Sequence, residues 1–414
     1  MAANLLRRPQ SAAAVPPPIP GNPASGWRKW AELDKSYVQR IAEHALSNDV
    51  ADYVHIRATC NPWRKNTEDP KLSSILDPRF HPRKWIVLPA DDRAGDDNEA
   101  RRRMVNISNG AKYVVQLPSI SGHAIAASSS GAPGGIMVLI NDCTAAIRLL
   151  NPITGQTADL PSVEPVMSRT RTGRLDRGFH ELCKVTGAGF VGDHTVVLHL
   201  GRDDRLVAAR LYGGHWEMVS RGTVLCSAFS LNGTVYFADT DGLMFVDLDK
   251  PSMRRLRRAA AWPEIDTETV VHMADDGAGR LLVIINRLYF KKEARREDDR
   301  YYTVEFEVFR LDPEARELVP VRNIGKRALF VGNYCGALVV PASASAPGTI
   351  VHNSIYFQHN GHPRFFVRRL SPRNNNSQVI EAPKGSFLDD ITSYVKWSGR
   401  KTMVAPAASI YGRV

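Results

Sequence analysis

The sequence predicts a mainly β protein, a six-bladed β-propeller preceded by a short α-helical module. Three observations support this prediction. From about residue 83 to residue 385, short β-branched and aromatic runs alternate with Gly, Asn, Asp and Pro turns. Hairpin-like units recur in this region at spacings close to those of propeller blades. Before residue 65, by contrast, apolar residues recur every three to four positions, as on an amphipathic helix.

The composition is that of a folded globular chain. Hydrophobic residues make up 43% of the 414 residues and charged residues 23%, close to the globular average. The apolar runs, such as residues 281–285, are much shorter than the roughly 20 residues of a membrane helix, so we expect no membrane-spanning segment. The N-terminus also lacks the apolar core of a secretory signal. We therefore expect a protein of the nucleus or the cytoplasm.

Cysteine usage agrees with a reducing compartment. The five cysteines are widely scattered, and no Cys-x-x-Cys pair exists. This pattern disfavours both a zinc site built on paired thiolates and a disulfide framework.

The net charge of +11 is diffuse. Residues 361–414 hold nine Lys and Arg against three acids, and two further clusters lie upstream. The clusters comprise Arg169, Arg171, Arg174, Arg177, Arg254, Arg255, Arg257 and Arg258. Phosphates attract such patches, but no nucleic-acid-binding module or basic-aromatic alternation is visible. The charge therefore favours an acidic protein partner over nucleic acid.

Four segments follow one another along the chain. Residues 1–26 form a Pro- and Ala-rich tail expected to be disordered. Residues 27–66 form the helical module: Asp34 or Ser36 can cap the first helix, and a second helix ends before Pro62. About 40 residues bury little core, so this module is expected to be a docking unit. Residues 67–83 form a linker, and residues 84–414 form the propeller.

The blade count rests on repeated hairpins. Residues 232–246 resemble residues 353–367, each with a turn Asn, an aromatic-rich strand, a polar turn and a second apolar strand. Similar hairpins start near residues 136, 194 and 281, and a further unit spans 84–117. These units predict six blades, although their irregular spacing leaves seven open. Residues 394–397 are expected to supply a strand that closes the ring.

Motifs that could carry chemistry are weak. Gly187-Ala-Gly189-Phe-Val-Gly192 is a formal dinucleotide fingerprint, but a strand-like run follows it where a helix is required, so it is interpreted as a hairpin turn. His352, His359 and His362 could bind a metal but lack a carboxylate partner, so loop histidines are favoured. No paired catalytic carboxylates are visible. We expect no enzyme activity, no catalytic residue, no cofactor and no metal. A propeller enzyme or small-molecule binder remains the alternative from a different class.

A resemblance to a known group rests on several motifs in order. The run Cys60-Asn-Pro-Trp63-Arg64 is similar to the end of an F-box, and residues 76–85 are similar to the segment that follows it in plant F-box proteins of the KIB-type propeller group, abundant in grasses. Further matches lie at residues 148–155, 159–161, 327–332 and 347–357.

The resemblance implies a receptor subunit of an SCF-type cullin-RING ubiquitin ligase, whose F-box docks on a Skp-type adaptor and whose propeller binds a target protein. The positions that it assigns to adaptor binding are Leu33, Val38, Ile41, Leu46, Ile56, Cys60, Trp63 and Arg64.

The sequence departs from the F-box pattern in one place. Asp34 stands where the pattern has Pro, and Ser36 stands at the acidic position that follows. Two alternatives therefore stay open: a helical pair packed on the propeller without any adaptor, and a propeller scaffold with a degenerate F-box that acts outside a ligase.

Overall fold

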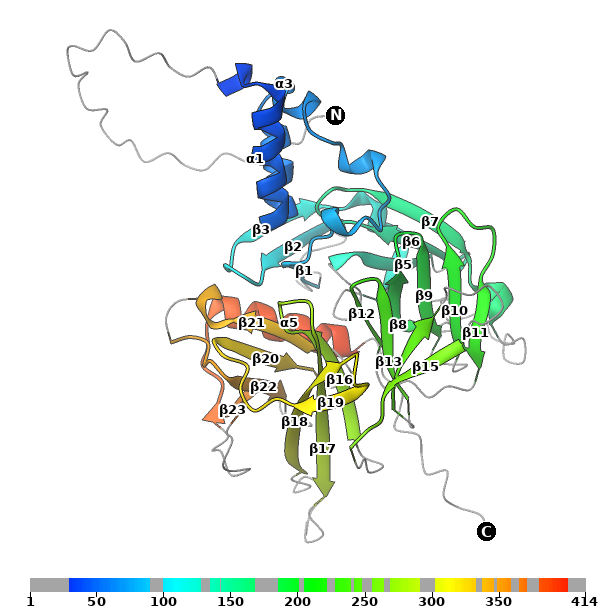
Figure 1. Ribbon diagram of the computed structural model, residues 1–414, viewed down its shortest axis with the longest axis vertical. Coiled ribbons are helices and arrows are strands. Elements are labelled where there is room, and N and C mark those ends of the chain that lie inside the picture. Colours follow the sequence, from blue (N-terminus) through cyan, green and yellow to red (C-terminus); the bar gives the residue numbers. More distant parts are fainter. Residues whose placement is uncertain are drawn as a thin grey trace, which may run out of the picture.

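A computed structural model describes most of the chain and shows a helical module on one side of a ring of β-sheets (Figure 1). The residues described are 30–89, 100–127, 135–141, 143–167, 185–200, 205–221, 228–239, 242–247, 255–263, 269–290, 302–332, 337–345, 348–358, 365–370 and 380–400. The predicted tail, residues 1–26, lies outside them.

The helical module starts with a 3₁₀ turn, η1 (Trp30–Glu32), followed by α1 (Lys35–Asn48), α2 (Val50–Thr59) and α3 (Asn61–Lys65). Asp34 caps α1, because its Oδ1 accepts the Ser36 backbone N–H at 2.8 Å. Asp49 caps α2 in the same way through the Ala51 N–H. Pro62 lies in the first turn of α3, where its missing N–H has no cost.

The strands form six sheets, the blades of the propeller. The first blade holds β1 (Trp85–Val87), β2 (Arg101–Asn106) and β3 (Lys112–Gln116). The second holds β4 (His123–Ala127), β5 (Met137–Asn141), β6 (Ala146–Leu150) and β7 (Thr157–Ser162), and the third holds β8 (Val185–Val191), β9 (Thr195–Leu200), β10 (Arg205–Arg210) and β11 (Glu217–Arg221).

The fourth blade holds β12 (Ala228–Leu231), β13 (Thr234–Asp239), β14 (Gly242–Asp247) and β15 (Arg255–Ala260). The fifth holds β16 (Thr269–Asp275), β17 (Leu281–Phe290), β18 (Tyr302–Asp312) and β19 (Glu317–Pro320). The sixth holds β20 (Arg327–Val331), β21 (Ala337–Pro341), β22 (Ser354–Gln358), β23 (Phe365–Arg369) and β24 (Ile380–Glu381). Each predicted hairpin falls in a different blade, so the six-bladed fold is confirmed.

The inner strands β4, β8, β12, β16 and β21 contact one another in that order. Blades two to five are antiparallel meanders, whereas the sixth has the order β21-β20-β22-β23-β24 with β20 and β22 parallel. The first blade lies between the second and the sixth blade and completes the ring. Trp85 and Val87 pack toward the second blade, and Ile86 and Leu88 pack toward the sixth, as the alternation of a strand requires.

The predicted closing strand at residues 394–397 is wrong. These residues lie in a helix, α5 (Ser386–Arg400). Its apolar residues repeat with the period of a helix and are buried against the first and sixth blades; they are Phe387, Leu388, Ile391, Tyr394 and Val395. The polar side of the helix contributes the Asp390 carboxylate, which contacts Lys112 on β3 and Arg103 on β2. A helix, rather than a strand, therefore joins the last blade to the first (Figure 1).

Candidate functional site

The helical module carries an exposed apolar surface. Tyr37 and Ile41 lie one turn apart on α1, with 61% and 37% of their surface exposed, and Trp30 precedes the helix with 57% exposed. We call these three residues the exposed patch. Tyr37 and Ile41 share one face of α1, and exposed apolar side chains gathered on one face mark a surface that a partner can cover.

The residues predicted to bind an adaptor fall into three groups. Val38 and Trp63 are buried within the module, at 1% and 9% exposure. The half-buried residues are Leu33, Leu46, Ile56 and Cys60, of which Leu46 and Ile56 pack against the buried pair Tyr53 and Phe80. Ile41 and Arg64 are exposed.

The buried and half-buried residues support the exposed patch rather than form part of it. Trp63 donates its indole N–H to the Trp30 carbonyl at 2.7 Å and so positions the exposed patch from behind. Leu33 and Val38 stand at the two positions of a hydrophobic staple around the Asp34 cap.

Arg57 is the structural centre of the module, a role that the sequence did not predict. Its guanidinium donates to the carbonyls of Thr67 and Glu68 at 2.6 and 2.7 Å and to the Arg64 carbonyl at 3.2 Å, and it pairs with Asp69 at 3.1 Å. One nearly buried cation thus satisfies the backbone that follows α3. The available signal was the spacing of Arg57, one helical turn after Tyr53 and on the same buried side of α2.

Asp49 attaches the module to the first blade. Beyond its capping bond, its carboxylate accepts the Trp85 indole N–H at 2.9 Å and the Asn106 side-chain amide at 2.8 Å. The Tyr113 ring stacks on Trp85 with centroids 5.0 Å apart and meets His55 of α2 edge-on at 5.8 Å. The cap of α2 is therefore also a link between the module and the ring.

Residues 67–83, predicted to be a linker, are packed onto the propeller, and we call them the strap. It includes two short 3₁₀ turns, η2 (Pro70–Leu72) and η3 (Pro78–Phe80). Ile75 and Leu76 are buried in the core between the second and third blades. Gly135 is needed where the strap ends, because a Cβ there would lie 2.8 Å from the Pro82 carbonyl oxygen.

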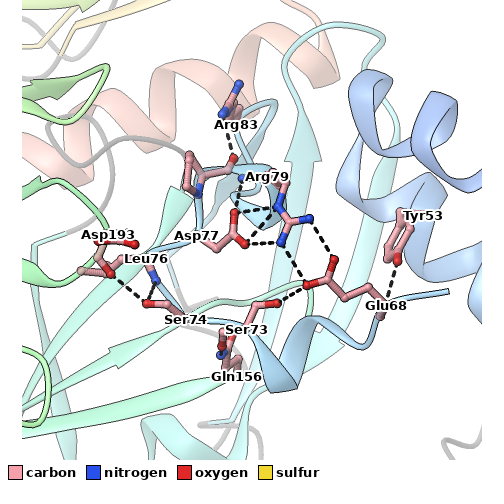
Figure 2. Close-up of polar contacts among 11 residues, drawn as sticks. Tyr53, Glu68, Ser73, Ser74, Leu76, Asp77, Arg79, Arg83, Gln156 and Asp193 are labelled. Carbon is pink, nitrogen blue, oxygen red and sulfur yellow. Dashed lines mark hydrogen bonds and ion pairs between the residues drawn. The ribbon is translucent and has the colours of Figure 1, made fainter.

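Polar contacts of the strap run in two directions, as Figure 2 shows. Toward the ring, Gln156 donates to the Ser73 carbonyl at 2.6 Å, and Ser74 donates to the Asp193 carbonyl at 2.9 Å. Toward the module, Tyr53 donates to the Glu68 carbonyl at 2.8 Å. The strap thus fixes the module to turns of both the second and the third blade.

Within the strap, Arg79 lies between two carboxylates, Glu68 at 2.8 Å and Asp77 at 2.7 Å. Hydrogen bonds from Arg79 lower the pKa of Glu68. Burial acts to raise the pKa of Asp77, but the bonds from Arg79 outweigh it and leave that pKa lowered. All three groups are therefore charged near neutral pH.

His81, at the end of the strap, is a buried neutral imidazole. Burial, together with the positive charge of Arg83, lowers its pKa to about 4. Its ring lies 6.3 Å from the Phe190 ring of β8, between the strap and the third blade. Protonation of this imidazole would place a charge in an apolar contact.

Within the described part of the chain, His, Cys, Asp and Glu side chains form no group of three that could hold a metal ion. Of the three histidines considered above, His359 and His362 lie outside the described residues. Within the same ranges, no helix has the length and apolar character needed to cross a bilayer.

Several solved structures resemble the chain at low sequence identity. Virginiamycin B lyase from Staphylococcus aureus is 12% identical and aligns over 64% of this chain and 85% of its own, with a TM-score of 0.27. The Cps50 (Swd1) β-propeller domain of Myceliophteria thermophila is 12% identical over 72% and 89%, with a TM-score of 0.35. A member of the DUF4221 family from Bacteroides vulgatus is 11% identical over 73% and 96%, with a TM-score of 0.33. Scores this low carry no argument about function.

Among curated proteins, no sequence matches the chain. The family model of the KIB1-4 beta-propeller does match it, over residues 104–380. The matched span runs from β2 to β24, whereas the helical module and the strap lie before it. Because the match covers about two thirds of the 414 residues, the chain belongs to the KIB1-4 beta-propeller family.

Proposed function

We propose that this protein is the substrate-recognition subunit of an SCF-type cullin-RING ubiquitin ligase. On this proposal the helical module is an F-box that docks on a Skp-type adaptor, and the propeller binds the target, as in the plant F-box proteins that the sequence resembles. The observation that carries the proposal is the exposed patch of Trp30, Tyr37 and Ile41 on an otherwise packed module that ends in the F-box-like residues 60–64.

The chemistry of the patch suits docking against another protein. Trp and Tyr are enriched in the residues that dominate binding energy at interfaces, as is Arg, which exposed Arg64 supplies. Helical partners are commonly recognised through apolar residues spaced one turn apart, the spacing of Tyr37 and Ile41. The remaining predicted contacts, Leu33 and Cys60, are half-buried and could add area at the edge of the patch.

The attachment of the module suits a receptor. A ligase receptor must hold its target at a defined place relative to the adaptor. A rigid connection between the two binding surfaces raises the effective concentration of the bound target near the adaptor. Asp49 and the strap supply such a connection. The end of the ring toward which β17 points in Figure 1 lies away from the helical module, and we propose that it holds the target, which the positive charge of the chain predicts to be acidic.

Adaptor binding tests the proposal. The full-length protein should bind an immobilised Skp-type adaptor, and Ile41→Asp should weaken that binding at least tenfold, because it places a charge in the patch. Gln39→Asp is the matched control: it adds the same charge on the same helix, two residues from Ile41 and therefore on a different face. Absence of binding by the wild-type protein would refute the ligase role.

The second candidate is a propeller scaffold whose degenerate F-box acts outside a ligase. Its supporting observation is that the module already uses much of its apolar surface on itself and on the propeller, with Val38 and Trp63 buried and Leu46 and Ile56 packed inward. A wild-type protein that captures target proteins but no adaptor would select this candidate.

A further inference from the structure

The first blade is short of one strand. Blades two to five have four described strands and the sixth has five, whereas the first has three. Its outer strand, β3, pairs only with β2 among the described strands. Figure 1 shows β3 at the rim of the ring, below α1. The outer edge of β3 therefore has no partner strand within the described part of the chain.

The register shows which backbone groups this edge presents. The Asn106 N–H donates to the Ala111 carbonyl, and the Leu117 N–H donates to the Ala100 carbonyl, at the two ends of the β2–β3 ladder. Because inward and outward groups alternate along an antiparallel strand, the N–H and C=O groups of Lys112, Val114 and Gln116 point outward. An unpaired row of this kind is a template for another strand.

The side chains of β3 are also exposed. Tyr113 is 41% exposed and Val114 53%, although both are apolar residues on a strand. They lie on opposite faces of the blade, so that an added strand would cover both. Within the described residues, the edge thus combines backbone groups that have no partner strand with apolar side chains on either side.

Charge indicates the kind of strand that fits. Arg101 and Arg103 of β2 lie opposite Gln116 and Val114 and share one face with Lys112. Asp390 pairs with Arg103 and Lys112, but one carboxylate cannot neutralise three cations. Arg101 is exposed, and the side chains of Arg103 and Lys112 remain 54% and 42% exposed. Among the described residues this face keeps a positive charge, which favours an acidic strand.

The two ends of the chain and a second copy of the protein fit the edge poorly. Residues 1–26 contain six prolines and no acid, and residues 401–414 contain no acid, so neither end of the chain complements the edge. A second copy paired antiparallel through β3 would bring two Lys112 side chains and four arginines onto one face, which like-charge repulsion opposes.

We propose that the outer edge of β3 binds an extended acidic peptide segment of a partner protein as the fourth strand of the first blade. The backbone of β3 supplies hydrogen bonds, Tyr113 and Val114 supply apolar contacts, and Arg101, Arg103 and Lys112 select acidic side chains. This inference does not depend on adaptor docking, because the edge and the exposed patch share no residue.

The test uses the full-length protein and a short acetylated, amidated peptide of alternating glutamate and valine, followed by fluorescence anisotropy. The wild-type protein should bind it, with an affinity that falls as salt is raised. Val114→Pro removes an outward N–H and leaves the β2 ladder intact, so it should weaken binding about tenfold or more. Val114→Thr, which keeps the N–H and the β-branched shape, should bind like the wild type. Arg101→Glu should weaken binding several-fold.

Two further measurements keep the test decisive. The same peptide with alternate amides N-methylated along one edge should not bind, which probes the backbone bonds even if Val114→Pro impairs folding. Adaptor binding should be equal in Val114→Pro and the wild type. The proposal is overturned if the wild type does not bind the acidic peptide, if a lysine-valine peptide binds equally well, or if Val114→Pro binds like Val114→Thr. It is also overturned if the wild type dimerises through this edge.

Discussion

The helices α1 and α5 have similar lengths, 14 and 15 residues, but their apolar residues have opposite surroundings. On α5, five apolar side chains are buried against the first and sixth blades. On α1, only Val38 and Ala42 are buried, and Tyr37 and Ile41 face outward. An amphipathic pattern therefore indicates that a helix has an apolar side, but tertiary contacts decide whether that side stabilises the fold or remains available to a partner.

The same substitution on both helices gives the largest contrast. Ile391→Asp places an unpaired charge at a site with 0% exposure, so we expect a loss of about 4 kcal/mol or more in the free energy of unfolding. Ile41→Asp, at an exposed site, should change stability by less than about 0.5 kcal/mol. Chemical denaturation of both variants measures the difference. Equal losses would contradict the distinction between the two helices.

Acid should loosen the strap, and with it the module that carries α1. His81 has a pKa of about 4 in the folded protein, against about 6.5 when unfolded. The folded state therefore binds fewer protons, and the contribution of His81, about 3 kcal/mol at most, is complete above pH 6.5 and is lost as the pH falls toward 4.

The variant His81→Phe removes this titration while keeping a ring against Phe190. Its stability should fall less steeply than that of the wild type between pH 6.5 and 4. His199, whose pKa burial also lowers to about 4, titrates in both proteins, so the difference between them isolates His81. Identical pH profiles would exclude a role for this imidazole.

Asp49→Ala should weaken the attachment of the module to the ring, with a smaller loss of stability than Ile391→Asp causes. It removes a helix cap and the acceptor for Trp85 and Asn106, which together contribute about 2 kcal/mol. Hydrogen exchange should rise in residues 35–59 and remain unchanged in α5. A uniform rise across both helices would show that Asp49 supports the whole fold rather than the attachment of α1.

The sequence predicted the blades better than their connections. Each hairpin carries its own local signal, a turn Asn or Gly between β-branched runs, as at Asn232 and Asn353. The apolar residues of α5 also repeat with a helical period in the sequence, although residues 394–397 were predicted to form a strand that closes the ring.

The strap could not be predicted, because its contacts join distant positions. Ser74 and Asp193, for example, are 119 residues apart. For the candidate site, Ile41 was among the predicted residues, whereas Trp30 and Tyr37 of the exposed patch were not, and the orientation of the predicted residues was not foreseen. Only tertiary packing shows that Val38 and Trp63 face inward while Ile41 faces out.

The position of α5 has a consequence for the synthesis of the protein. Ile86, Leu88 and Val105 of the first blade lie in the same core cluster as Ile391 and Val395, which the ribosome makes about three hundred residues later. At a synthesis rate of about 5–20 residues per second, the apolar face of the first blade stays uncovered by α5 for tens of seconds. Ring closure is therefore a late event in the life of each chain, and until then that face is a natural substrate for chaperones.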